Sequence, residues 1–259
     1  IVVGGGARGA SSSLTKLAEA LDAPVLSTVA GKGALDERHP LAAGARLHHP
    51  PTRDALLAGA DHVLLLGTQL SPTDYWQFEH AEEVPLPALA EGRATHVDID
   101  ARALAQGGVE AHGGRAVLAD ASDACHALLD AIGSDSSSSS GAATTTTAAT
   151  TATTHAARAV AAAKAASDAP SALSQTLMWD FEDAAGGGQA ILQTLAGLRA
   201  ALPDDTPLVS DVCRLGYTAL SMYPAHRPSS FLYPVGTTAL GYGLPAAVGA
   251  CLGRRLHGG

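Results

Sequence analysis

Along residues 1–132, short apolar runs alternate with segments in which apolar residues recur at helical spacing. The runs predict buried strands, and the expected strands are Ile1–Val3, Pro24–Val29, His62–Gly67, Thr95–Ile99 and Ala116–Leu118. Buried strands separated by helices are typical of a parallel sheet that is covered on both faces. We therefore predict an α/β fold with a Rossmann-like central domain over residues 1–132.

The helices expected between these strands follow the same apolar pattern. One begins at Ser11–Ser13, whose hydroxyls can cap it, and its apolar stripe is formed by Leu14, Leu17, Ala18 and Leu21. Another opens at Thr52 and stops near Gly59. A third begins at Ser122 and is expected to bury Cys125, Leu128 and Leu129.

The composition changes abruptly at Ser134. A serine run, Ser136–Ser140, is followed by a tract of threonine and alanine. A stretch with almost no large apolar side chain cannot offset the entropy cost of ordering, so we expect Ser134–Thr154 to be mobile. The Ala-rich segment His155–Ala166 is compatible with a helix. We predict a low-complexity Ser/Thr/Ala linker over residues 133–187.

A second α/β unit is expected over residues 188–259. It opens with a helical stripe that ends at Pro203 and consists of Ile191, Leu195, Leu198 and Leu202. After it, short strands are expected at Leu208–Val209 and Phe231–Tyr233, and helices at Tyr217–Met222 and Gly241–Leu252. Because so few strands are present, we predict that this unit is the N-terminal part of a second domain.

Charge and cysteine content exclude several classes of protein. Lys+Arg number 16 and Asp+Glu 25, a net charge of −9, whereas nucleic-acid binding needs clustered Lys and Arg. No apolar stretch reaches the ~18–20 residues that span a bilayer, and no secretory signal is evident. The three distant cysteines indicate neither a disulfide framework nor a zinc site. We expect a cytoplasmic protein without nucleic-acid or membrane partners, and the opening Ile1 suggests part of a longer polypeptide.

Gly4–Gly9 fits the pattern G-x-G-x-x-G between an expected strand and an expected helix. Its functional interpretation is a nucleotide diphosphate bound at the helix N-terminus. That interpretation requires an acid at the end of the second strand, but Ser27–Gly31 stands there and the first acid is Asp36. We therefore favour a tight strand-to-helix turn, and NAD is disfavoured.

Two sets of polar residues have competing interpretations. Three histidines lack a carboxylate or cysteine at metal-ligand spacing, so we predict loop histidines rather than a metal site. They are His39, His48 and His49. Asp98 and Asp100 lie at the end of an expected strand, where they can bind a ribose or cap the following turn. The residues leave both roles open.

The most informative stretch is Leu208–Cys251. Val209–Arg214 places a helix start after a strand, where backbone N–H groups can meet a diphosphate. Cys213 in this segment is predicted to be a small buried residue rather than a reactive thiol. The glycines of Gly236–Ala250 permit close approach of a flat ligand, and Pro245 suits the first turn of a helix. The residues alone predict a glycine-rich ligand loop.

These segments resemble thiamine-diphosphate enzymes of the acetolactate synthase/benzoylformate decarboxylase superfamily. Ser210–Cys213 and Leu240–Ala250 are similar to the pattern S-D-V-G…G-x-M/L-G-x-G-L-P-A-A-I-G-A at the start of that superfamily's diphosphate-binding domain. Val2–Ala7, Thr28–Gly33 and Val97–Asp100 resemble its central domain. The resemblance covers both structured parts of the chain.

The resemblance implies a fragment of an enzyme that acts on 2-oxo acids, by decarboxylation or acetolactate-type carboligation through a C2 ylid of the cofactor. The cofactor-binding residues that it implies are Val212, Cys213, Arg214, Thr238, Ala239, Leu240 and Gly241. The first three would line the diphosphate and the others would hold the aminopyrimidine. The side chain of Leu240 would keep the cofactor bent, which makes it the one catalytic candidate.

The chain departs from the family pattern in three respects. Cys213 stands where the family has Gly. Gly67–Gln69 stands where flavin-binding members carry an Arg, which puts FAD in doubt. The Mg²⁺-binding G-D-G…N segment and the glutamate that activates the pyrimidine are absent, so magnesium ligands are expected beyond Gly259. The 259 residues alone are therefore expected to be inactive, and the intact protein to be a homodimer or homotetramer.

Two other functions stay open at this stage. The first domain could be a nucleotide-binding module that holds FAD or another adenine nucleotide as a structural ligand. Alternatively, the chain could be a non-catalytic remnant. Neither the identity of the 2-oxo acid nor the choice between decarboxylation and carboligation follows from these residues.

Overall fold

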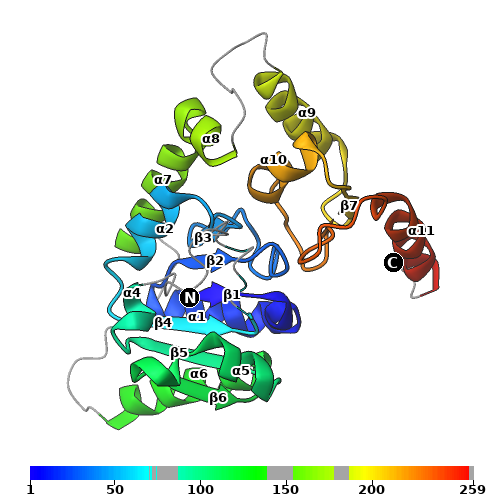
Figure 1. Cartoon of the computed structure of the whole chain (residues 1–259). Coiled ribbons are helices and arrows are strands. Elements are labelled where there is room, and N and C mark those ends of the chain that lie inside the picture. Colours follow the sequence, from blue (N-terminus) through cyan, green and yellow to red (C-terminus); the bar gives the residue numbers. More distant parts are fainter. Residues whose placement is uncertain (70, 72–73, 75–86, 139–153, 178–186, 257–259) are drawn as a thin grey trace.

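The computed structural model describes residues 1–256 except 70, 72–73, 75–86, 139–153 and 178–186 (Figure 1). Its strands are β1 Val2–Val3, β2 Val25–Ser27, β3 Ala42–Gly44, β4 Val63–Leu66, β5 Ala94–Asp98, β6 Arg115–Leu118, β7 Leu208–Val209 and β8 Phe231–Leu232. Its helices are η1 Gly5–Ala10, α1 Ser11–Leu21, α2 Pro50–Leu57, α4 Pro87–Ala90, α5 Ala101–Gly107, η2 Glu110–His112, α6 Ala121–Ser138, α7 His155–Asp168, α8 Pro170–Leu177, α9 Gly188–Ala201, α10 Arg214–Met222 and α11 Gly243–Leu256. Among the described helices, none is long and apolar enough to cross a bilayer.

Six strands form one parallel sheet in the order β3-β2-β1-β4-β5-β6. The predicted α/β fold is thereby confirmed. The strand order is that of the doubly wound dinucleotide-binding folds, in which the chain starts at the centre and builds outward in both directions. The connections from β1 and β4 therefore leave on opposite sides, and a crevice opens between their carboxyl ends.

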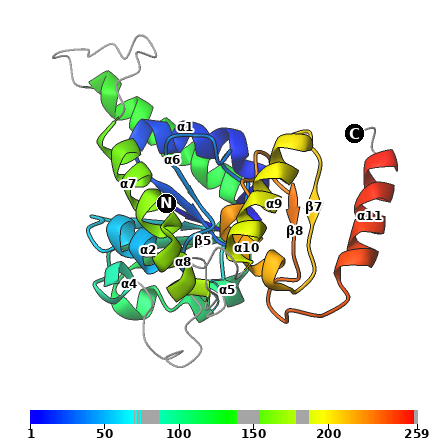
Figure 2. The ribbon, with the colours of Figure 1, turned by 90° about the horizontal axis from the view of Figure 1, so that it is seen from above.

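Successive residues of the central strands pack into two separate cores, one on each face of the sheet. The face covered by α1 and α6 contains Val3, Leu14, Leu17, Leu66 and Cys125 (Figure 2). The opposite face, covered by α2 and α7, contains Val2, Leu57, Leu65 and Val160. Since both faces of the central strands β1, β2 and β4 are covered, nearly every position in them favours an apolar residue, and they appear in the sequence as continuous apolar runs.

Three details of this unit differ from the sequence prediction. The serines do not cap α1, because the chain enters it through η1 and the cap residue is Ala10, whose carbonyl accepts the Ser13 hydroxyl at 3.0 Å. Leu128 is 38% exposed, since the buried stripe of α6 follows Cys125, Leu129 and Ile132. Strand β3 was not expected, because its sequence Ala-Ala-Gly has no large apolar side chain.

The predicted linker contains described helices. α6 continues to Ser138, and α7 packs on α2, where the hydroxyls of Thr52 and Ser167 lie 2.5 Å apart. Arg46 in the loop after β3 forms an ion pair of 3.0 Å with Asp168 of α7. Most of the tract predicted to be mobile, residues 139–153, lies outside the described residues. Because α7 contributes to the buried core of the sheet, we propose that the first unit extends through α7.

The second unit is built on a two-stranded parallel sheet, β7 and β8. α9 and α10 pack on each other beside it, and its buried core consists of Leu195, Ala219, Leu220, Tyr223, Ala225, Phe231 and Tyr233. α11 contacts β7 and lies at the end of the molecule farthest from the first sheet (Figures 1 and 2). Its large apolar side chains are exposed, namely Leu244, Val248, Leu252 and Leu256.

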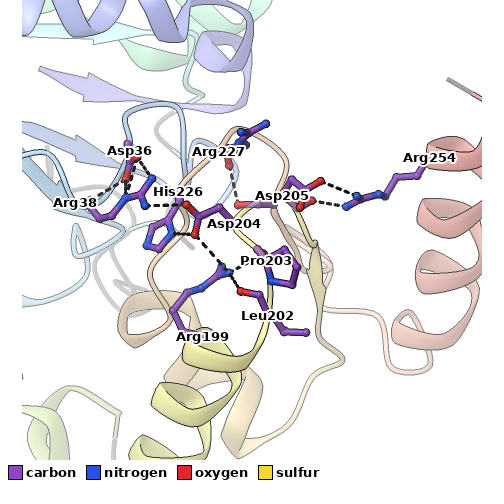
Figure 3. Close-up of polar contacts among 11 residues, drawn as sticks. Asp36, Arg38, Arg199, Leu202, Pro203, Asp204, Asp205, His226, Arg227 and Arg254 are labelled. Carbon is purple, nitrogen blue, oxygen red and sulfur yellow. Dashed lines mark hydrogen bonds and ion pairs between the residues drawn. The ribbon is translucent and has the colours of Figure 1, made fainter. Parts of the chain in front are cut away.

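Polar contacts join the two units (Figure 3). Arg38, in the loop after β2, forms ion pairs with its neighbour Asp36 at 2.6 Å and with Asp204 of the second unit at 2.7 Å. The other oxygen of the Asp204 carboxylate lies 2.7 Å from Nδ1 of His226. On the far side of Asp204, Arg254 ties α11 to Asp205 at 2.8 Å. Asp204 therefore lies at the centre of the polar contact between the two units, which consists of Asp36, Arg38, Asp204 and His226 and is called the joint below.

A buried ion pair lies beside that joint. Lys32 is almost completely enclosed, and its Nζ lies 2.8 Å from a carboxylate oxygen of Glu37 and 5.7 Å from the ring centroid of Phe231 in β8. The backbone N–H of Glu37 donates to the carbonyl of Ala225 at 3.1 Å. The loop after β2 thus contacts the second unit through apolar, ionic and backbone contacts.

Candidate functional site

The glycine-rich turn after β1 forms one wall of a cavity of about 440 Å³. The cavity lies at the carboxyl ends of β1, β2, β4 and β5, where α/β sheets of this strand order bind ligands. Val235 and Gly236 of the second unit also line it. Its polar lining consists of Thr28, Thr68, Gln69, Ser71, Asp74 and Asp98.

Close backbone packing explains two glycines of the motif. The N–H of Gly6 donates to the carbonyl of Gly67 at 3.0 Å, and that of Gly4 donates to Leu66 at 2.9 Å. A Cβ on Gly6 would lie 2.9 Å from the Gly67 Cα, and one on Gly4 would overlap the Gly67 carbonyl. The motif therefore makes the tight turn that the sequence favoured, and its position also places it at the cavity.

The acids at the carboxyl end of β5 have the capping role that was one of their two interpretations. Asp98 accepts the N–H of Asp100 at 2.9 Å, and Asp100 caps α5 by accepting the N–H of Arg102 at 2.8 Å. Asp98 also lines the cavity. Sequence reasoning missed Asp74, which accepts the N–H of Ser71 at 3.2 Å and whose pKa burial raises to about 6.

The predicted loop histidines do lie in loops, but two of them are buried. His48 and His49 are packed between β3 and α2 with ring centroids 4.5 Å apart, and His49 is 0% exposed. Burial, together with the charge of Arg46, lowers the pKa of His49 to about 3. In the part of the chain that the structure describes, no three His, Cys, Asp or Glu side chains gather as metal ligands.

The two segments predicted to contact a cofactor meet at Asp211, two residues beyond the end of β7. Its Oδ1 accepts the N–H groups of Val212 at 2.8 Å and Gly241 at 3.1 Å, and its Oδ2 accepts that of Gly243 at 2.8 Å. These three donors lower the pKa of the Asp211 carboxyl below its ordinary value. The sequence prediction did not include Asp211, because two of its three partners, Gly241 and Gly243, lie far along the chain.

The prediction that Cys213 is buried is wrong. Cys213 is exposed and is the N-cap residue of α10, where its Sγ accepts the N–H of Gly216 at 3.3 Å. Arg214, the first residue of α10, is exposed as well, and Val212 is half-buried. Segment 212–214 therefore lies at an accessible helix N-terminus.

The segment 238–241 is an exposed turn that precedes α11. Thr238 and Gly241 have left-handed backbone conformations, with φ values of 46° and 86°. Leu240 between them is 79% exposed, so its side chain is accessible to a ligand. An exposed leucine on a turn held in this conformation is compatible with the cofactor contact that was predicted for it.

Residues 1–128 match the family model of the thiamine pyrophosphate enzyme central domain. The probable 2-ketoarginine decarboxylase AruI of Pseudomonas aeruginosa is 36% identical over 253 residues, which cover 98% of this chain and 38% of that protein. The chain belongs to the thiamine-diphosphate-dependent enzyme superfamily.

Two further comparisons agree with that membership. A probable acetolactate synthase large subunit of Methanocaldococcus jannaschii is 25% identical over 96% of this chain and 38% of that protein. A solved structure from Mycobacterium smegmatis, described as thiamin diphosphate-dependent, aligns with a TM-score of 0.61 and 22% identity over 99% of this chain and 42% of that one. This last likeness concerns the fold. The chain spans 38% of the length of these two curated relatives.

The residues present fit the diphosphate end of the superfamily's cofactor. The N-termini of α10 and α11 both lie next to Asp211, and helix N-termini carry backbone donors and partial positive charge that suit phosphates. The Val212 N–H is engaged by Asp211, so diphosphate contacts at this point would fall to the turn that begins at Cys213. Magnesium has no comparable fit, because the described residues contain no cluster of ligands for it.

Proposed function

We propose that this chain supplies the central domain and one part of the cofactor site of a thiamine-diphosphate-dependent enzyme that decarboxylates a 2-oxo acid. The observation that carries the proposal is the junction at Asp211, which brings segments 212–214 and 238–241 together beside two helix N-termini. The relative with 36% identity is named a probable 2-ketoarginine decarboxylase, so 2-ketoarginine is the first substrate to test.

When bound, thiamine diphosphate supplies the electron sink for the loss of carbon dioxide from a 2-oxo acid. The residues of this chain would hold and orient it. The first turn of α10 would face the diphosphate, and the turn 238–241 would contact the aminopyrimidine ring. The exposed side chain of Leu240 would pack against the bent cofactor and maintain its shape. Mg²⁺, its ligands and a partner subunit would come from outside the described residues.

A chimera with the Pseudomonas relative tests this function. Residues 1–259 would replace the matching segment of AruI, and carbon dioxide release from 2-ketoarginine would be measured with thiamine diphosphate and Mg²⁺ present. We expect turnover by the chimera and none by the 259-residue chain alone, which lacks metal ligands among its described residues. A folded chimera that binds thiamine diphosphate but decarboxylates neither 2-ketoarginine nor pyruvate would contradict the proposal.

Leu240→Ala in that chimera tests the cofactor contact. Leu240 is exposed, so the substitution should leave unfolding unchanged while relaxing the cofactor, and a misplacement of ~1 Å can cost on the order of a hundredfold in rate. The measurement is hydrogen–deuterium exchange at C2 of the bound cofactor at saturating concentration. Leu244→Ala, a similarly exposed leucine on α11, is the control. Equal exchange in both variants would remove Leu240 from the mechanism.

A second function is favoured by the cavity at Gly4–Gly6, namely binding of an adenine nucleotide as a structural ligand. Its described lining contains two carboxylates, Asp74 and Asp98, and no Lys or Arg. A diphosphate such as that of FAD would therefore be poorly compensated there. Calorimetric titration with AMP, ADP and FAD would test this; binding of AMP in preference to the two diphosphates is the expected result.

A further inference from the structure

Asp211 is held in place from three directions. The Ser210 hydroxyl donates to the Asp211 carbonyl at 3.0 Å, and a Cβ on Gly216 in the first turn of α10 would overlap that same carbonyl oxygen. On the other side, a Cβ on Gly243 would lie 3.2 Å from both the Cβ and the Oδ2 of Asp211. The strand end, the first turn of α10 and the start of α11 therefore meet with Asp211 between them.

We propose that Asp211 is a positioning residue that sets the separation between the two cofactor-contacting segments, 212–214 and 238–241. One carboxylate reaches both segments, because Oδ1 accepts from Val212 in the first and from Gly241 in the second. Oδ2 fixes Gly243, the first residue of α11, and so anchors the far end of the turn. We call this set of three hydrogen bonds, from Val212, Gly241 and Gly243 to the Asp211 carboxylate, the clamp. The clamp is a property of the chain itself, whereas the importance of the separation for a cofactor rests on the proposed function.

The chemistry of the clamp favours a carboxylate over any neutral side chain. Hydrogen bonds from backbone N–H groups to an ionised acceptor are shorter and about twice as strong as those to neutral acceptors. The turn also contains left-handed residues, Thr238 and Gly241, and a non-glycine residue in that region stays there only when surrounding contacts enforce it. Donation to the carboxylate depresses the Asp211 pKa, so the clamp stays charged at neutral pH.

Two substitutions separate the clamp from ordinary helix capping. Asp211→Ala removes both carboxylate oxygens that accept these N–H groups. Asp211→Asn keeps one acceptor oxygen, which can serve the partners of Oδ1 or the partner of Oδ2 but not both sets. The matched control is Asp100→Asn, because Asp100 also accepts a backbone N–H at a helix start but lies in the first unit.

The first measurement is residue-resolved amide hydrogen exchange on the 259-residue chain without cofactor. Asp211→Ala should raise exchange at both Gly241 and Gly243 by about tenfold. Asp211→Asn should raise it at only one of the two, and Asp100→Asn at neither. Unchanged exchange at both glycines in Asp211→Ala would overturn the clamp. If Asp211→Ala does not fold, Asp211→Asn decides the matter by the same criterion.

The second measurement tests positioning in the AruI chimera. A clamp that only supports the fold would lower the unfolding midpoint and leave cofactor kinetics alone. A positioning residue should instead raise the KM for thiamine diphosphate by about tenfold in Asp211→Asn, with kcat at saturating cofactor within about twofold. An unchanged KM would overturn the positioning role. A parent chimera that does not use thiamine diphosphate would contradict the proposed function, and the exchange experiment would still decide the clamp.

Discussion

The two units of this chain differ in how completely they bury their apolar side chains. The first covers both faces of the central strands of a six-stranded sheet, so that Val3 and Leu66 are completely buried. The second has a two-stranded sheet, and a row of large apolar side chains on α11 is exposed. Small sheets are marginal without further packing. Stability is therefore expected to come from the first unit, while the proposed cofactor contacts lie in the second.

The same contrast holds for charged side chains, although the second unit buries hydroxyl groups such as those of Thr218 and Tyr223. The first unit buries charged and titratable side chains, including the Lys32–Glu37 ion pair and His49. In the second unit, the proposed cofactor segments and Leu240 are largely accessible. Buried polar groups constrain the fold strongly because they are costly to leave without partners. Accessible groups on a turn leave the fold largely unaffected when they change, which allows a site to be tested without unfolding the protein.

The largest expected effect compares one leucine from each unit. Leu14→Ala removes a side chain that is 0% exposed between α1 and the sheet, and should lower the free energy of unfolding by about 2–5 kcal/mol. Leu244→Ala on α11 removes an exposed side chain and should change it by less than about 0.5 kcal/mol. Urea unfolding followed by circular dichroism measures both. Equal losses would show that α11 is packed and that the contrast between the units is wrong.

An intermediate effect comes from His49 and depends on pH. The pKa of His49 in the folded chain is about 3, below its ordinary value of 6.5. Between these two pH values the His49 imidazole is protonated in the unfolded chain and neutral in the folded chain. Its contribution to stability is therefore complete above pH 6.5 and is lost as the pH falls, on the order of 2 kcal/mol by about pH 5. His49→Leu should flatten this loss in urea unfolding between about pH 7 and 5.

The control for that experiment is His126→Asn, at an exposed position of α6 in the same unit. It should leave the pH dependence unchanged. His48 keeps a parallel dependence, because burial lowers its pKa as well, so the His49 variant reduces the slope without abolishing it. A slope identical to that of the unsubstituted chain would show that His49 is hydrated in solution.

The elements that could be predicted from the sequence are those whose own residues show a regular apolar pattern. β4 is a continuous apolar run because both of its faces are covered, and α1 has a regular stripe because only one of its faces is covered. β3 could not be found, since Ala42–Gly44 is a strand only through its pairing with β2. The burial of His49 was missed for a related reason: the helix that covers α2, α7, lies in a segment of low-complexity composition.

The site divides in the same way. The glycine-rich pattern and the resemblance predicted cofactor contacts at segments 212–214 and 238–241, because the signal lies in the local sequence, and these contacts stay a prediction. The role of Asp211 was not predictable, since its acceptor function depends on Gly241 and Gly243, which the fold brings to it from the start of α11. The exposure of Cys213 was missed because a cysteine is more often buried, whereas here it caps a helix at the surface.

The smallest expected effect is at the joint between the units, at the ion pair of Arg38 and Asp204. Both side chains are substantially exposed, and exposed pairs contribute little because water and salt screen them. The hydrogen bond from His226, followed by the contacts with Arg38, lowers the Asp204 pKa, so the pair persists at neutral pH and is lost only when acid protonates the carboxylate.

A double-mutant cycle with Arg38→Ala and Asp204→Asn should show weak coupling in the unfolding midpoint. The coupling should disappear in about 1 M NaCl, where the screening length falls to about 3 Å. Arg53→Ala, which breaks a partly exposed pair with Asp54 within the first unit, is the control and should not couple to Asp204→Asn. Coupling that survives high salt would mean that the joint is drier and tighter than its exposure indicates, and that the two units act as one body.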